Sequence, residues 1–415
     1  MTAIVSGNGL GLSNSSSATL GQRGSFGSFG SGRNGEQVAV NIATGNLVLQ
    51  NQDDFLVSHG TDIATVRTYN SQGQDSFGSG GAWFNYSNAL HLRLNGAPNS
   101  SGSSITRYEA DGAVSDFLYD ATAGHYVSSA GGGAFDTIVA TVDGFTWVDG
   151  SSRASAQYNG SGTLISSSDR TGNRLDYSYD TNNPNLLRMV SDAFGGSTRY
   201  DYQGNLLSEI HTISSQAGGR DQTRVRYHYD GSNRLDRVTV DLSPQDNSVS
   251  DGNVYVTEYT YDGASHRLAS ISQSDGSSLA FTWQYVNSAF RVATISDALG
   301  RKTTYTYATN ITHVSGSNGV QSYEYDQKGQ LTRSRTGLSQ LDFSYFDNGD
   351  VQQISEIGGI DGRTRVTTFG YDSNGNAISQ TDNNGSIINR VFDGKNQLIS
   401  EKVTLDSNTR LITRN

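Results

Sequence analysis

A tyrosine-rich motif recurs along the last two thirds of the chain and constrains its fold more than any single residue does. The motif is clearest as YHYDGSNRL at 227–235, YEYDQKGQL at 323–331 and FGYDSNGNAI at 369–378. The second aromatic of each copy is taken as an anchor, and successive anchors lie 18 to 32 residues apart. A period in that range predicts an array of small supersecondary units. The anchors are Tyr158, Tyr179, Tyr202, Tyr229, Tyr261, Tyr285, Tyr307, Tyr325, Tyr345, Tyr371 and Phe392.

Each unit predicts a β-hairpin. Aromatics two residues apart, such as Tyr227 and Tyr229, point to the same face of a strand because side chains alternate with period two. An Asp follows most anchors, and Gly or Asn, which accept positive φ readily, stands four residues after them. This pattern fits a type I turn closed by a left-handed residue. The repeat residues that carry the prediction are Tyr179, Asp180, Tyr229, Asp230, Asn233, Tyr261, Asp262, Tyr325, Asp326, Gly329, Tyr371, Asp372 and Gly375.

The fold expected from these units is all-β. One hairpin is marginally stable in water, so the units must pack side by side. We therefore predict an array of antiparallel β-hairpins that forms a curved, spiralling sheet or partial shell. Helix should make up less than about a tenth of the residues, well below the share in ordinary globular domains.

The units resemble the RHS/YD-repeat family. Several are led by D-x-x-G-x-x-x-x-Y, as in DRTGNRLDYSYD at 169–180, and the segment NGEQVAVNIATGNLVLQNQDDF at 34–55, with VRTYNSQG at 66–73, is similar to the region that precedes the repeats in those proteins. The resemblance covers roughly residues 34–415. It implies a sheet that winds into a hollow case around an unfolded or inhibited cargo. The family includes toxin shells, surface proteins and animal adhesion receptors.

Three regions are expected along the chain. Residues 1–36 are rich in Gly and Ser, which predicts a flexible leader. Residues 37–150 contain short alternating runs without clear repeats, which predicts a β-rich region that leads into the repeats. Residues 151–415 hold the YD-repeat hairpin array.

Composition narrows the range of functions. A formal net charge of −11 and a pI near 5.0 disfavour binding to nucleic acid or anionic membranes. The chain has no cysteine, which excludes disulfides and Cys-based zinc sites. No stretch approaches the ~18 apolar residues of a membrane helix. The first residues lack the basic and apolar parts of a signal peptide, so export would need another route.

No catalytic, cofactor-binding or metal-binding residue is predicted. Nucleotide-binding, serine-hydrolase and H-E-x-x-H motifs are absent, and the seven histidines form no i,i+4 pair. His228 alternates with two motif tyrosines, which places it on the opposite, exposed face. The recurring aspartates are interpreted as turn caps rather than calcium ligands, because only one recurs in each turn. The tyrosines are interpreted as packing residues, with sugar stacking left open.

The leading functional hypothesis is a non-catalytic structural part of an RHS-type shell that encloses or presents a toxin cargo in a secreted bacterial protein. The expected partners are a cargo polypeptide or the rest of a larger shell, with no nucleic acid, no membrane span and no cofactor. The alternative is an extracellular or cell-surface adhesin or carbohydrate-binding module. The P-x-x-x-x-D-P-x-G segment of self-cleaving RHS shells is absent, so self-cleavage is not implied. The chain is then either the front part of a longer protein, which we expect, or a truncated member of the family.

Overall fold

The computed structural model describes residues 3–12, 37–58, 60–73, 83–85, 90–128, 135–214, 219–317, 319–358, 362–405 and 408–413. In these residues the regular structure is β-strand apart from one 3₁₀ turn, η3 (Pro244–Asp246). The predicted all-β fold, with its array of antiparallel hairpins in a curved sheet, is confirmed.

The strands form two sheets. The N-terminal sheet has five strands: β1 (Ala3–Val5), β2 (Gln37–Asn41), β3 (Leu47–Leu56), β4 (Ile63–Asn70) and β5 (Trp83–Asn85). The long sheet begins with β6 (His91–Asn95), β7 (Ser104–Tyr108), β8 (Val114–Asp120), β9 (His125–Val127), β10 (Thr137–Ala140) and β11 (Gly144–Val148).

The long sheet continues through the repeats. Its next strands are β12 (Ser155–Asn159), β13 (Leu164–Ser168), β14 (Arg174–Tyr179), β15 (Leu187–Asp192), β16 (Ser197–Gln203), β17 (Leu206–Ile213), β18 (Asp221–Tyr229), β19 (Leu235–Asp241), β20 (Val254–Tyr261), β21 (Leu268–Gln273), β22 (Ser278–Val286), β23 (Ala289–Asp297), β24 (Lys302–Ala308) and β25 (Ile311–Gly316). The last are β26 (Gly319–Tyr325), β27 (Leu331–Thr336), β28 (Ser339–Tyr345), β29 (Val351–Ile357), β30 (Arg365–Tyr371), β31 (Ala377–Asp382), β32 (Ile387–Phe392), β33 (Leu398–Leu405) and β34 (Asn408–Thr413).

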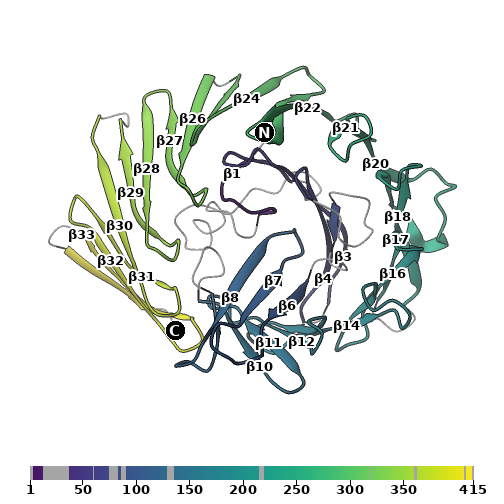
Figure 1. Cartoon of the computed structure of the whole chain (residues 1–415), viewed down its shortest axis with the longest axis horizontal. Coiled ribbons are helices and arrows are strands. Elements are labelled where there is room, and N and C mark those ends of the chain that lie inside the picture. The colour runs from purple at the N-terminus through teal and green to yellow at the C-terminus, as the bar shows by residue number, and fades with distance from the viewer. Residues whose placement is uncertain are drawn as a thin grey trace.

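The long sheet is an antiparallel meander that bends around the N-terminal sheet. From β6 onward, each strand pairs with the next one in sequence, as the hairpin motif requires. The repeats follow one another around a ring, and β1, β3 and β4 lie inside it (Figure 1). The ring therefore has a concave face toward the N-terminal sheet and a convex face toward solvent.

Side chains join the last repeats to the first. Asn396, in the turn between β32 and β33, is buried, and its Nδ2 donates to the carbonyl oxygens of Gly150 (2.5 Å) and Ser151 (3.2 Å) in the turn before β12. In Figure 1 the C-terminal strands accordingly come round to β10 and β11. The repeats thus complete about one turn of the ring, and at this seam the bonds come from an asparagine side chain rather than from paired strands.

Two features of the sheets bear on the predicted regions. Residues 3–12 belong to the N-terminal sheet, because β1 pairs in parallel with β2 and Val5 and Leu12 are buried. The apolar run in β1 outweighs the Gly and Ser that follow it, and 13–36 lie outside the described residues. At the other boundary, β6–β11 already belong to the long sheet. The change of sheet falls between β5 and β6.

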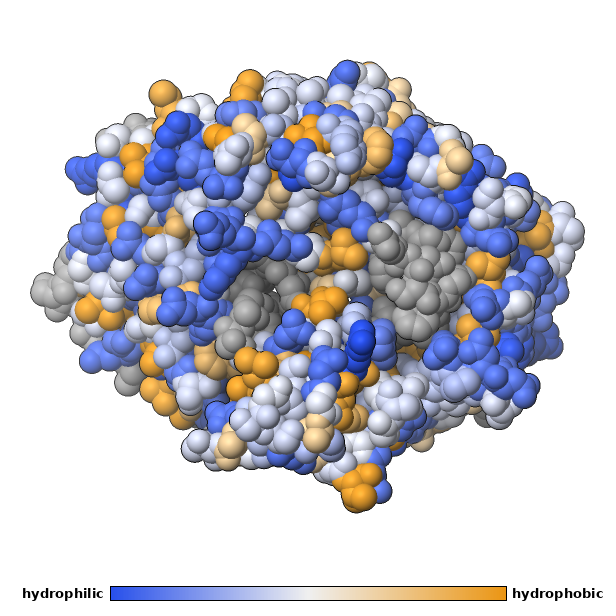
Figure 2. Space-filling model, viewed as in Figure 1, coloured by the Kyte–Doolittle hydropathy of each residue, from blue (hydrophilic) through white to orange (hydrophobic). Residues whose placement is uncertain are grey.

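The face of the molecule seen in Figure 2 is largely hydrophilic. Figure 2 shows a face that is hollowed in the middle, with apolar residues gathered around the hollow and polar ones around much of the rim. The main apolar core lies between the concave face of β6–β25 and the N-terminal sheet. His228 points the other way, with a side chain that is 61% exposed, as its alternation with the tyrosines requires.

Candidate functional site

The repeat turn is the local unit from which the ring is built. At Asp230, the Asn233 N–H donates to the Asp230 carbonyl and the Asp230 N–H to the Arg234 carbonyl, both at 2.9 Å. Asn233 has φ 59°, the left-handed value that Gly or Asn adopts most readily. The Asp230 carboxylate accepts the N–H groups of Ser232 and Arg234 at 2.8 and 3.0 Å. This is a type I turn closed by a left-handed residue, held by an aspartate cap.

The same geometry recurs at two other aspartates singled out from the sequence. Asp326 is followed by Gly329 at φ 73° and Asp372 by Gly375 at φ 77°, with the same pair of backbone bonds. Asp180 and Asp262 instead open longer loops. Their N–H groups donate to carbonyls further along the chain, at Leu186 and Arg267. The backbone closure of the turn therefore tolerates insertions.

The anchor aromatics couple one repeat to the repeat before it. The register shifts just before nine of the predicted anchors, from Tyr158 to Phe392, which places each of them beside the start of the return strand. The predicted anchor Tyr307 shows no such shift. In five of the nine the hydroxyl donates to a backbone carbonyl at the start of the preceding return strand. These bonds are Tyr202 to Leu187 (3.0 Å), Tyr229 to Leu207 (2.9 Å), Tyr261 to Leu235 (2.6 Å), Tyr345 to Leu331 (2.5 Å) and Tyr371 to Val351 (3.0 Å).

The anchor predicted at Tyr285 is wrong. Trp283 occupies that place, because the register shifts between Thr282 and Trp283 and the indole Nε1–H donates to the Leu268 carbonyl at 2.9 Å. The hairpin runs on past Trp283 and closes through Asn287 and Ser288, both with positive φ. Tyr285 is left 65% exposed. An aromatic two residues from another aromatic does not by itself fix where the bulge falls.

The electrostatics of the turns and anchors follow from their surroundings. Burial raises the pKa of Tyr179, Tyr229 and Tyr261, so these hydroxyls stay neutral, and those of Tyr229 and Tyr261 donate hydrogen bonds. The side-chain amide of Asn173, together with the hydroxyl and backbone donors of the turn, lowers the pKa of Asp169 to about 2. For Asp230, burial acts to raise the pKa, but the Arg234 backbone N–H and guanidinium outweigh it and the pKa falls.

A buried ion pair attaches the N-terminal sheet to the repeats. Arg67 on β4 binds both carboxylate oxygens of Asp53 on β3, at 2.8 and 2.9 Å, and its Nη1 donates to the Tyr259 hydroxyl at 3.1 Å. The Tyr227 hydroxyl donates to the same carboxylate at 2.5 Å. The guanidinium also lies over the Trp83 ring, 4.4 Å from its centroid. Both charges are thus satisfied in a site where Arg67 and Asp53 are 3% and 7% exposed.

The pKa shifts at this junction keep the Arg67 guanidinium charged and the Tyr227 hydroxyl neutral. Burial alone would lower the pKa of Arg67, but the Asp53 carboxylate and the Tyr259 hydroxyl raise it well above its usual value. Burial, followed by the adjacent Asp53 charge, raises the pKa of Tyr227. These groups are bonded to one another and attach the N-terminal sheet to the repeats.

Further polar contacts spread along the same junction. The Tyr200 hydroxyl and the Thr65 hydroxyl lie 2.8 Å apart, and the Tyr69 hydroxyl donates to the His266 carbonyl at 3.0 Å. Further along the ring, Thr312 donates to the Ile42 carbonyl at 2.6 Å. Strands β2–β4 are therefore bonded to repeats from β16 to β25.

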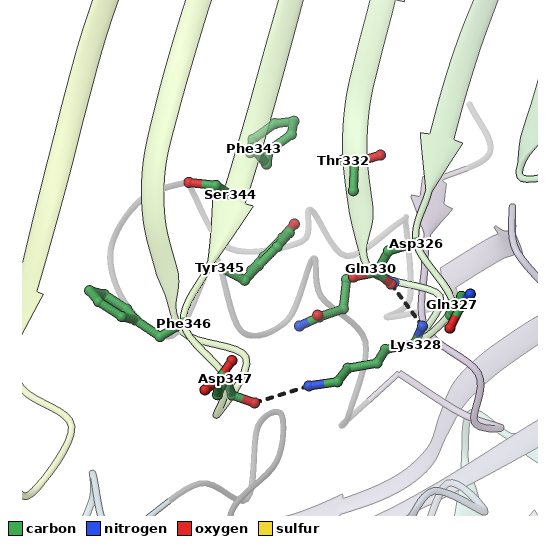
Figure 3. A pocket seen from close by; sticks show the side chains of 10 residues that line it. All are labelled: Asp326, Gln327, Lys328, Gln330, Thr332, Phe343, Ser344, Tyr345, Phe346 and Asp347. Atoms are coloured by element: carbon green, nitrogen blue, oxygen red, sulfur yellow. Dashed lines mark hydrogen bonds between the residues drawn. The ribbon is translucent and has the colours of Figure 1, made fainter.

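A pocket of about 520 Å³ opens between two neighbouring repeat turns, at Asp326–Gln330 and Phe343–Asp347 (Figure 3). The Lys328 ammonium closes one side by donating to the Asp347 carbonyl at 3.0 Å. The Tyr345 ring lies between the two turns (Figure 3), and its hydroxyl is engaged with the Leu331 carbonyl. The Lys328 ammonium and the Tyr345 hydroxyl in this pocket are thus engaged in holding the turns.

One group of chemically active side chains escaped the sequence analysis. Among the described residues, Asp201, Glu209 and His211 form a group of acidic and histidine side chains close enough to hold a metal ion. Asp201 pairs directly with Glu209 across β16 and β17. Only the strand register brings these residues together, so a search for histidines at i,i+4 could not find them. The signal available in the sequence was the spacing of Glu209 and His211, which are two residues apart and therefore lie on the same face of a strand.

Comparisons with known proteins agree with the repeat architecture. A family model described as Teneurin YD-shell matches residues 149–404, and a domain of unknown function, DUF6531, matches residues 38–117. No curated protein matches the sequence. Among the described residues, no helix is both long and apolar enough to cross a membrane.

Solved structures give distant matches. The chain is similar to TcdB2-TccC3 without its hypervariable C-terminal region, with 12% identity, a TM-score of 0.40, and coverage of 86% of this chain and 24% of that chain. It is also similar to the Tc holotoxin pore of Photorhabdus luminescens, with 12% identity, a TM-score of 0.33, and coverage of 86% and 22%. The chain spans about a quarter of the length of these structures. Because the YD-shell model matches more than half of the chain, over the strands that carry the repeats, the chain belongs to the Teneurin YD-shell family.

Proposed function

We propose that this chain is a non-catalytic wall segment of an RHS-type shell, whose concave face holds a polypeptide cargo of a larger secreted bacterial protein. The observation that carries the proposal is the junction at Arg67. The concave face of β16–β25 already takes up the chain's own N-terminal sheet, through tyrosine hydroxyls and apolar packing.

The later repeats offer a second concave surface of the same kind. Phe343 and Val351 are buried there, and the partly buried Tyr345, Ile354 and Phe369 pack against them. These residues occupy the positions that face the N-terminal sheet in the earlier repeats. A face with apolar side chains set among polar ones suits an extended polypeptide of mixed composition better than a single small molecule.

The state of the tyrosines supports a wall rather than a sugar-stacking platform. Sugar stacking needs exposed ring faces, whereas the anchors Tyr179, Tyr229 and Tyr261 are largely buried and Tyr371 is half-buried with its hydroxyl engaged. The motif aromatics two residues before the anchors are more deeply buried in the earlier repeats, as at Tyr200 and Tyr259.

Protection of an attached cargo tests the proposal. An unfolded, protease-sensitive segment would be fused after Asn415 and digested under native conditions. We expect cleavage at least tenfold slower than that of the same segment free in solution. Ile354→Lys, on the concave face, should restore rapid cleavage, while Gln353→Lys, its neighbour on the opposite face, should not. Cleavage of the fused segment at the free rate, with the fold intact by circular dichroism, would contradict the proposal.

A further inference from the structure

The group of Asp201, Glu209 and His211 lies on the convex face of β16–β17, away from the cargo face. Tyr200 and Ile210, which alternate with these residues, are buried in the core. The His211 Nε2 atom lies 3.2 Å from Asp201 Oδ2 and 3.3 Å from Glu209 Oε2. His211 itself is only 8% exposed. A buried imidazole nitrogen is therefore aimed between two carboxylates.

The other ring nitrogen identifies which tautomer faces them. His211 Nδ1 lies 3.1 Å from Asp221 Oδ1 and 3.2 Å from the Thr223 hydroxyl. Because a carboxylate only accepts hydrogen bonds, Nδ1 carries a proton that it donates to Asp221. In the neutral ring, Nε2 then presents its lone pair. A carboxylate behind a histidine is the usual outer-shell arrangement that orients a metal-binding imidazole.

The Nε2 atom has no hydrogen-bond partner among the described residues, although it is buried. A lone pair facing two negatively charged oxygens is repulsive unless a cation lies among the three atoms. The neighbouring arginines contact the two carboxylates rather than the imidazole. Arg199 Nη2 lies 3.3 Å from Asp201 Oδ2 and Arg188 Nη1 lies 4.0 Å from Asp201 Oδ1, while Arg226 Nε lies 3.7 Å from the other oxygen of Glu209, Oε1.

We propose that Asp201, Glu209 and His211 form a binding site for a divalent transition-metal ion of the zinc class. Zinc bound by nitrogen and oxygen at about 2.0–2.1 Å in a tetrahedron has ligand atoms about 3.3–3.4 Å apart, close to the separations from Nε2 to the two oxygens. An imidazole ligand favours zinc over calcium or magnesium. Two carboxylates and a neutral imidazole balance the charge of the ion.

The surroundings hold the ligands and leave one position open. Asn247, just after η3, accepts a hydrogen bond from the Thr223 N–H at 2.8 Å and donates to the Asp221 carbonyl at 3.1 Å, which fixes the strand behind His211. The side chains of Asp201 and Glu209 are 38% and 40% exposed, so the fourth ligand of the ion is water. This is the open pattern of three protein ligands and one solvent molecule.

Metal titration of the full chain tests the site. After dialysis against a chelator, we expect one zinc ion per chain by calorimetry, and cobalt(II) should give the intense visible absorption of a tetrahedral site. Glu209→Gln and Asp201→Asn should each weaken zinc binding at least tenfold and remove any zinc-dependent rise in melting temperature. Asp236→Asn is the matched control, because Asp236 pairs with the exposed His228 at 2.5 Å without a second carboxylate.

Two outcomes would overturn the proposal. If the chain takes up no zinc, the three side chains hold no metal ion and form an ion pair between the histidine and the carboxylates. If zinc binds but neither substitution weakens it, the ion lies elsewhere. Circular dichroism of both variants separates loss of the site from loss of the fold, and neither outcome bears on cargo protection.

Discussion

The repeats that face the N-terminal sheet and the repeats that follow them share one turn motif but differ in what covers their concave face. In the first group, the aromatic two residues before the anchor is a buried tyrosine at Tyr200, Tyr227 and Tyr259, with a hydroxyl bonded to the N-terminal sheet. In the second group that position is Phe343, then Phe369, then Arg390. The motif thus specifies the hairpin, and the N-terminal sheet determines which repeats are deeply buried.

The largest expected difference lies in the ion pairs of the two groups. Arg67→Ala leaves Asp53 charged and buried, and should lower the free energy of unfolding by about 3–5 kcal/mol. Arg390→Ala removes the pair with Glu401 in the later repeats, where both side chains are partly exposed, and should cost no more than about 1 kcal/mol. Urea denaturation of both variants measures the contrast. Equal losses would show that the N-terminal sheet does not stabilise the ring preferentially.

The left-handed turn residues give the next largest effect. Asn233→Val places a β-branched residue at φ 59° and should destabilise by about 1–3 kcal/mol. Asn396→Val meets the same strain and also loses the bonds to Gly150 and Ser151. Its melting temperature should therefore fall further. If the two variants melt alike, the seam between the last and first repeats contributes nothing to stability.

The hairpins could be predicted from the sequence, but the way they assemble could not. Turn type, strand period and the left-handed positions are local properties, so Asp230, Asn233 and Gly329 could be read directly from spacing. The position of the N-terminal sheet inside the ring depends on contacts between residues such as Asp53 and Tyr227, which are far apart in sequence. Strand register accounts for the two remaining differences from the prediction. It moved one anchor from Tyr285 to Trp283 and brought Asp201 opposite Glu209, and register is fixed by long-range pairing.

The anchor hydroxyls should contribute equally in both groups. Tyr229 and Tyr371 donate the same bond to the preceding repeat, at 2.9 and 3.0 Å. Tyr229→Phe and Tyr371→Phe should each cost about 1 kcal/mol, the net value of one hydrogen bond. Chemical denaturation of the two variants provides the comparison. A loss confined to Tyr229 would mean that the bond matters only where the N-terminal sheet covers the repeat.

The smallest expected effect is the acid sensitivity of the turns. Asp169 in an early repeat and Asp382 in a later one both have lowered pKa values, through hydrogen bonds from Asn173 and from the Ser386 N–H respectively. A lowered pKa in the folded state means that the unfolded chain binds the proton first as the pH falls. The stabilisation is therefore complete above about pH 4. It is lost as the pH falls toward 2, the pKa of Asp169.

Because both aspartates are only partly buried, the effect on melting temperature should be small in each group. Asp169→Asn and Asp382→Asn should each flatten the fall in melting temperature between pH 4 and pH 2 while changing it little at pH 7. The side-chain amide of asparagine retains an acceptor oxygen for the turn N–H groups but does not titrate. Melting curves measured across this range for both variants and the unaltered chain decide the point. If the fall in melting temperature is flattened in only one variant, the aspartate cap acts differently in the two groups. Equal flattening means that the turn acts as an autonomous unit in both parts of the ring.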